Sequence, residues 1–348
     1  MPRHLDRNPD MHVRGLEAAF ASLAFALGLW LATPGTAWAG GGCRGEDPLQ
    51  ARTLAARVSA VACRENRLWY EAFIDIDGRL ASTTVAEMEA DALSDGMTPA
   101  WKRVVDYWRG SGLLGAVAQR PGASTCEYVT NDSYASPNCR GFLIDTPWSA
   151  AFVSYVMIQS GVPGFAASPS HIDYVRDAYR NQEHGPFRIA DPLSETPADG
   201  DLLCFTRGAS SVTDHAALMT WLGTNGSGAL AMHCDIVVDA NGSGDGRAYL
   251  VGGNVLQAVT MRILPINHAG RFWNLPQGRS IGCRPSNPGA CSFNRQNWVA
   301  LLKLKPGLPM PTMPASPRDW QPAAPQEQCC IHCVVGSGVP RCPNPATP

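Results

Sequence analysis

The chain has 348 residues, 45% of them hydrophobic, and a formal net charge of −2. A balance this close to neutral gives no basic footprint for nucleic acid, so we expect no nucleic-acid partner. The length suffices for one elaborated domain with appendages.

The N-terminus has the pattern of a secretory signal peptide. Three arginines precede an apolar run over residues 18–32, and small residues around Ala39 suit cleavage. We predict a signal peptide over residues 1–39, no membrane span after its removal, and a periplasmic or secreted protein. An uncleaved membrane anchor is less favoured, because about 15 apolar residues fall short of the roughly 20 that a spanning helix needs. Lipidation of Cys43 and a start at Met11 are further alternatives.

All 12 cysteines follow this segment. In an oxidising compartment an even number of cysteines predicts disulfides. The candidates are Cys126, Cys139, Cys204, Cys234, Cys283 and Cys291.

Helical spacing dominates the first half of the predicted domain, residues 40–304. Apolar residues recur at helical intervals over residues 47–73 and again over 99–108. Residues 76–96 are polar with little periodicity. Residues 116–140 read as a loop that a disulfide between Cys126 and Cys139 would staple.

A third helical run places a hydroxyl at a helix start. Thr146 is a suitable N-cap, Pro147 suits the first helical position, and the run stops at Gly161. Ser149 then lies in the first turn, where unpaired N–H groups and the helix dipole favour developing negative charge. This setting predicts a nucleophile.

After residue 200 the sequence changes to short β-rich runs, at 201–206, 232–238, 248–251, 259–264 and 298–304. Turn residues 241–246 separate two of them as in a hairpin. Helices followed by an antiparallel sheet predict an α+β domain, with the N-terminal helices packed on the sheet. A proline-rich linker at 305–325 and a cysteine-rich tail at 326–348 follow. Zinc binding by the tail is an alternative to disulfides, since Cys330, His332 and Cys333 are closely spaced.

His233 and Asn254 are the candidate partners of Ser149. Neighbouring residues on a strand point to opposite faces, so if His233 faces the nucleophile helix, Cys234 points away and pairs with Cys204. Asn254 would orient the His233 ring through a hydrogen bond to its far nitrogen. The alternatives are a packed core histidine and an ordinary Gly-Gly-Asn turn.

Trp148 and His171 are candidate binding residues. Trp148 directly precedes Ser149, and His171 opens another helical run through residue 178, from which it could line the same cleft. A capping contact at the helix start is the alternative for His171.

These motifs, in this order, carry a family resemblance. The nucleophile at a helix start, the histidine on a strand after Gly-Asp-Leu, and the later Gly-Gly-Asn resemble papain-like cell-wall hydrolases: NlpC-type peptidases and the CHAP amidohydrolases. Residues 67–73, 105–108, 147–152, 200–205, 233–235 and 252–254 are similar to a bacterial family, domain of unknown function 2272, and the resemblance spans roughly residues 47–304. It implies a papain-like fold.

One departure affects the expected activity, because the related amidohydrolases have cysteine where this chain has Ser149. A hydroxyl is not ionised by a helix dipole worth about 0.3 to 2 kcal/mol, so a neutral histidine must remove its proton. We therefore expect an exported cell-envelope hydrolase that cleaves amide bonds in peptidoglycan peptides through Ser149, His233 and Asn254, without a cofactor or metal. The alternatives are an inactive papain-like module that binds an envelope peptide or glycan, and a scaffold for an interacting tail.

Overall fold

A computed structural model describes residues 41–310, except 46, 88, 130–135, 225, 274, 276–277 and 279–281. The predicted signal peptide, most of the predicted linker, and the tail with its alternative zinc site lie outside the described residues.

Seven α-helices appear in the described part of the chain. They are α2 (Leu54–Leu68), α3 (Ala100–Gly110), α4 (Ala123–Glu127), α5 (Ser136–Asp145), α6 (Ser149–Ser160), α7 (His171–Arg180) and α8 (His215–Thr224). Two 3-10 turns, Gly115–Val117 and Pro288–Ala290, accompany them.

The strands form one eight-stranded sheet in the order β2-β1-β7-β6-β5-β4-β8-β3. They are β1 (Phe73–Ile74), β2 (Leu80–Ser82), β3 (Phe187–Ala190), β4 (Leu202–Thr206), β5 (Met232–Ala240), β6 (Arg247–Val255), β7 (Ala258–Pro265) and β8 (Asn297–Leu304). The α+β prediction is confirmed. The sheet is mixed rather than wholly antiparallel, because β1 pairs with β7 in parallel.

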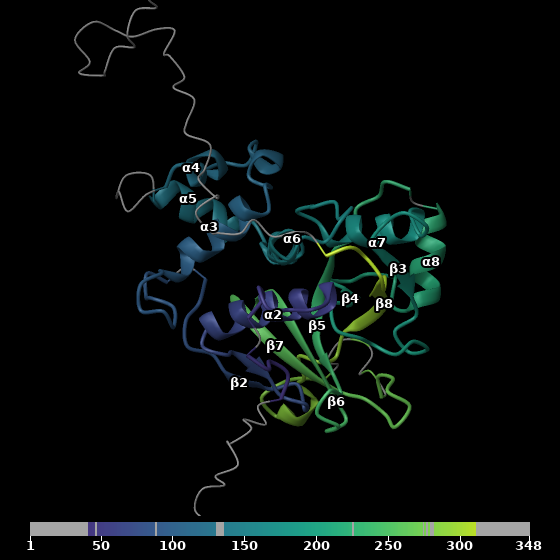
Figure 1. Cartoon of the computed structure of the whole chain (residues 1–348). Coiled ribbons are helices and arrows are strands. Elements are labelled where there is room, and N and C mark those ends of the chain that lie inside the picture. The colour runs from purple at the N-terminus through teal and green to yellow at the C-terminus, as the bar shows by residue number, and fades with distance from the viewer. Residues whose placement is uncertain are drawn as a thin grey trace, which may run out of the picture.

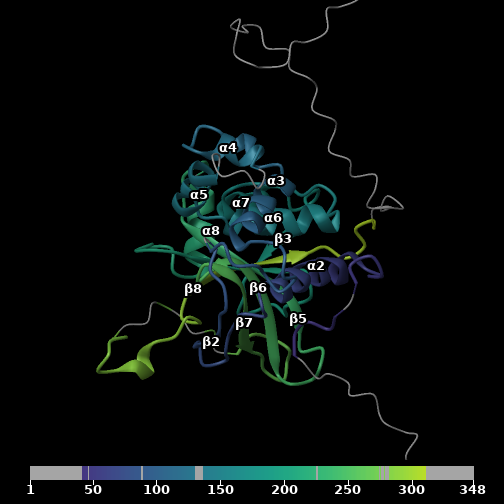
Figure 2. The same cartoon turned by 90° about the vertical axis from the view of Figure 1, so that its left-hand side faces the viewer.

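Each face of the sheet has its own apolar core. Helices α2 and α6 pack on one face over β5 and β6, with α3, α4 and α5 on one side of α6 and α7 and α8 on the other (Figure 1). Seen from the side, most helices gather above the sheet (Figure 2). On the opposite face, Phe272, Leu275 and Trp298 cover residues such as Leu203 and Leu250.

Several helix predictions need correction. The run at 47–73 is helical only over α2, because Tyr70 and Glu71 take left-handed backbone angles (φ 59° and 54°) that end the helix before β1. The predicted loop at 116–140 contains α4 and the start of α5. Helix α6 begins at Ser149, with Trp148 rather than Thr146 at its N-cap position and no side-chain cap bond to its own backbone.

Four disulfides join the described residues. Cys126–Cys139 links α4 to α5, and Cys204–Cys234 links directly paired residues of β4 and β5, as predicted. Cys283 pairs with Cys291. The fourth bond, Cys43–Cys63, occupies the sulfur that lipidation of Cys43 would need, so the lipoprotein alternative is wrong.

These four bonds fit a protein outside the reducing cytoplasm. In the part of the chain that is described, no single helix is long and apolar enough to cross a membrane; α5 and α6 satisfy the length and composition only as a pair bent by 102°.

Candidate active site

Ser149 is hydrogen-bonded to a histidine, but the partner is His171. The Ser149 Oγ lies 2.9 Å from Nε2 of His171, the first residue of α7. Both residues are buried, with 4% and 3% of their surface exposed. The His171 side chain therefore contacts the neighbouring helix start rather than capping its own helix.

Burial also fixes the charge of His171. Its pKa lies well below the ordinary value of 6.5, chiefly because the ring is buried and also because the positive charge of Arg207 opposes protonation. His171 is therefore neutral near pH 7 and can accept a proton. Its Nδ1 is buried, with no hydrogen-bond partner among the described residues.

His233 has both ring nitrogens engaged elsewhere. Arg207 Nη2 donates to Nδ1 at 2.9 Å, and because a guanidinium is only a donor, Nδ1 must be unprotonated. Nε2 then carries the hydrogen and donates to Asp235 Oδ1 at 2.7 Å. His233 is thus a neutral ring without a free acceptor for the Ser149 hydroxyl.

The strand register explains this placement. His233 pairs with Phe205 and lies two residues from Asp235, so both polar side chains share one face of β5. Cys234 lies on the other face, in the core shared with the helices. His233 and Cys234 do point to opposite faces of the sheet, but the face toward the helices carries the disulfide. The His233 ring contacts the candidate site by packing beside the His171 ring, with a centroid distance of 5.2 Å.

Asp235 and Arg262 form a buried ion pair next to His233. Arg262 Nε donates to Asp235 Oδ2 at 2.9 Å, and both side chains are almost fully buried. Although burial opposes ionisation, the positive charge of Arg262 and the hydrogen bonds from His233 and Arg262 hold the pKa of Asp235 below its usual range. The carboxylate is therefore charged and fixes the tautomer of His233, the role predicted for Asn254.

Asn254 instead holds the start of α6. With its amide oriented to satisfy its neighbours, the oxygen accepts from the Trp148 backbone N–H at 3.2 Å and the nitrogen donates to Glu87 Oε2 at 3.1 Å. Glu87 also accepts from the Trp148 indole, and burial raises the pKa of its carboxyl. Asn254 adopts φ 54°, which asparagine tolerates better than most residues.

Trp148 is a core residue in this structure. Its side chain is fully buried and stacks on Trp69 and Tyr107, with ring centroids 5.9 and 5.4 Å apart. It positions the residue before Ser149 and has no surface for the ligand contact that we predicted.

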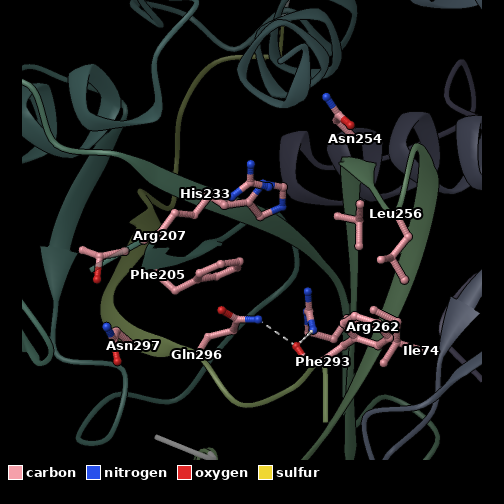
Figure 3. A pocket seen from close by; sticks show the side chains of 13 residues that line it. Ile74, Phe205, Arg207, His233, Asn254, Leu256, Arg262, Phe293, Gln296 and Asn297 are labelled. Atoms are coloured by element: carbon pink, nitrogen blue, oxygen red, sulfur yellow. Dashed lines mark hydrogen bonds between the residues drawn. The ribbon is translucent and has the colours of Figure 1, made fainter. Parts of the chain in front are cut away.

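A cavity of about 360 Å³ opens beside this site, and its walls include His233, Asn254, Arg207 and Arg262 (Figure 3). Among the described residues, no group of three or more His, Cys, Asp or Glu side chains is arranged to hold a metal ion.

Four residues of the site were not assigned from the sequence: Asp235, Arg207, Arg262 and Glu87. The His-Cys-Asp order on one strand carried a signal for Asp235, since residues two apart on a strand share a face. Glu87 lies in the polar segment at 76–96, and nothing in its sequence surroundings points to the helix start that it contacts.

An α+β domain with a buried serine-histidine pair at a helix N-terminus is the class that this fold and site define. The chain belongs to a family described as uncharacterized protein conserved in bacteria (DUF2272), which it matches over residues 95–304. No curated protein and no solved structure matches the chain.

Proposed function

We propose that this protein is an exported hydrolase of the cell envelope that cleaves an amide bond, with Ser149 as nucleophile and His171 as its base. The observation that carries the proposal is the 2.9 Å contact between the Ser149 Oγ and His171 Nε2 at the start of α6. Hydrogen-bond reach between a nucleophile and a neutral imidazole is the geometry that activates a hydroxyl.

The reaction follows from the atoms present. As the Ser149 Oγ attacks the substrate carbonyl, His171 Nε2 takes the hydroxyl proton, which requires the hydrogen of the resting ring to be on Nδ1. His171 then returns the proton to the leaving amine, and water releases the acyl group from Ser149 with His171 again as base. Unpaired N–H groups in the first turn of α6 favour the negative charge that develops on the carbonyl oxygen.

His233 is a positioning residue in this scheme. Asp235 and Arg207 hold the ring against His171, where a neutral His233 adds no positive charge beside the base. This replaces the predicted arrangement, in which His233 was the base and Asn254 its orienting partner.

The substrate class is supported by export and by resemblance. Disulfides fit a compartment outside the cytoplasm, and the ordered motifs resemble papain-like enzymes that act on cell-wall peptides. Peptidoglycan peptides are therefore the proposed substrate.

The test is release of fragments from purified peptidoglycan sacculi, measured as new amino groups and by mass spectrometry. Wild-type protein is expected to release fragments, and Ser149→Ala to lose the activity at least 100-fold. Ser160→Ala is the matched control, because it removes another buried hydroxyl from the same helix. Equal release by wild type and Ser149→Ala would refute the proposal.

The histidine assignment has its own test. His171→Gln should lose as much activity as Ser149→Ala, and the double variant should lose little more, because the two residues act as one unit. His184→Gln provides the control, since His184 is exposed. If His233→Gln abolished hydrolysis while His171→Gln left it intact, the base would be His233.

A second candidate function is a catalytically silent module that binds an envelope peptide or glycan. The burial of Ser149 favours it, because only 4% of the residue is exposed beside a cavity lined by other side chains. Binding to sacculi that is equal in wild type and Ser149→Ala, with no fragments released by either, would support this function over hydrolysis.

A further inference from the structure

The cavity beside the site contains a half-buried arginine, Arg207, that pairs with no carboxylate of the described residues. Arg207 follows β4, and its Nη2 donates to the neutral His233 ring. Among the described residues, no carboxylate lies within 4 Å of its guanidinium, whereas Arg262 is paired with Asp235.

The charges around the cavity do not cancel. Asp235 is matched by Arg262, which also donates to the Phe293 carbonyl at 2.6 Å and to Asn294 Oδ1 at 3.0 Å. His233 is neutral. Arg207 is therefore left as one excess positive charge at the cavity wall.

Keeping this cation partly out of water has a cost. Burial lowers the pKa of Arg207, against the opposing attraction of Asp235. A buried charge is stabilised when an opposite charge meets it with good geometry, and the planar fork of a guanidinium suits a carboxylate through two parallel hydrogen bonds.

The other residues that line the cavity indicate the chemistry of the rest of the ligand. Ile74, Phe205 and Leu256 supply apolar surface, while Asn297 contributes an amide whose side chain bonds to no other described residue (Figure 3). A volume of about 360 Å³ is at the lower end of the usual range for small-ligand pockets, roughly 300 to 1,000 Å³. The cavity thus suits a short segment that is apolar on one side and anionic at one point.

We infer that this cavity is a binding subsite for a carboxylate group of a peptide, which Arg207 holds by its guanidinium. The identification of the ligand as a peptide rests on the proposed function. Two residues connect the cavity wall to the candidate catalytic pair: His233 lines the cavity and packs beside His171, and Asn254 lines it and bonds to the residue before Ser149.

The experiment measures binding in Ser149→Ala, so that it does not depend on catalysis. N-acetyl-Ala-Ala and its C-terminal amide are titrated into the full mature protein by calorimetry at low salt. The free acid is expected to bind at least tenfold more tightly than the amide. Arg207→Gln should remove this difference, and Arg207→Lys should reduce it, because lysine keeps the charge but not the fork.

Arg188→Gln is the matched control, since Arg188 is an exposed arginine on β3 and should leave the preference intact. Equal binding of acid and amide, or a preference that persists in Arg207→Gln, would overturn the inference. Displacement of the acid by an equal concentration of inorganic phosphate would overturn the assignment to carboxylate. Acid-selective binding without any hydrolysis of sacculi by wild type would refute the hydrolase and keep the subsite.

Discussion

Asp235 is expected to be the most costly polar residue of the site to neutralise. It is 1% exposed and accepts hydrogen bonds from His233 at 2.7 Å and from Arg262 at 2.9 Å. Asp235→Asn keeps the shape of the side chain but leaves the buried Arg262 charge without its counterion. Removing one partner of a buried ion pair costs about 3 to 5 kcal/mol, a large share of the roughly 5 to 15 kcal/mol that stabilises a domain.

The measurement is urea unfolding at pH 7 of wild type, Asp235→Asn, Arg262→Gln and the double variant. The double variant should be more stable than the sum of the two single losses predicts, because it leaves no unpaired charge. Asp77→Asn is the control, since the Asp77–Arg79 pair is exposed and such pairs contribute about 0 to 1 kcal/mol. A loss below about 1 kcal/mol for Asp235→Asn, at an unchanged m value, would refute the reasoning.

Three further predictions concern stability. Replacing Cys204 and Cys234 by alanine opens a loop with a sequence separation of 30, for which chain entropy predicts a loss of about 3 to 4 kcal/mol in thermal or urea unfolding; an unchanged midpoint would contradict it. Burial lowers the pKa values of both site histidines in the folded protein. As the pH falls below the ordinary value of 6.5, only the unfolded chain therefore takes up their protons. The free energy of unfolding is highest above that pH and should decrease as the pH falls, by up to about 1.4 kcal/mol per pH unit for each histidine. The slope is measured in an Asp199→Asn background, because burial raises the pKa of the Asp199 carboxyl to about 6 and its protonation below that pH would stabilise the folded protein. In this background His171→Gln should halve the slope, and an unaltered slope would contradict the assignment. Asn254→Ala should lower the free energy of unfolding by about 2 kcal/mol, because it removes the hydrogen bond to the Trp148 N–H and places alanine in a left-handed backbone conformation. Asn254→Gly should recover the part of this loss that comes from the backbone conformation, in the same unfolding assay. Equal losses for the two variants would show that the backbone conformation contributes nothing.

The sheet could be predicted from the sequence where strands are long. All five predicted runs correspond to β4–β8, because each combines β-branched residues with turn signals at its ends. Strands β1 and β2 have two and three residues, too few for any periodicity to show. The parallel pairing of β1 with β7 depends on where the chain returns after α2, which local sequence does not encode.

The candidate site could be predicted only in part. The helix start placed Ser149 correctly, because the helical pattern and its Gly161 stop are local features. Its histidine partner depends on how α7 docks against α6, and a histidine on a strand and one at a helix start look equally suitable before that packing is known. The packing of α7 against α6 decides between them, because it brings His171 Nε2 within 2.9 Å of the Ser149 Oγ, while His233 bonds to Asp235 and Arg207.

The disulfide pattern has a consequence for biogenesis. Within the described residues, each disulfide joins two cysteines that are consecutive in the sequence, with separations of 20, 13, 30 and 8 residues. A polypeptide that enters an oxidising compartment with its N-terminus first would present these thiols in the order in which they pair. Simple sequential oxidation during translocation would then produce the native bonds, and a disulfide isomerase would have no mispaired bridges to correct in this domain.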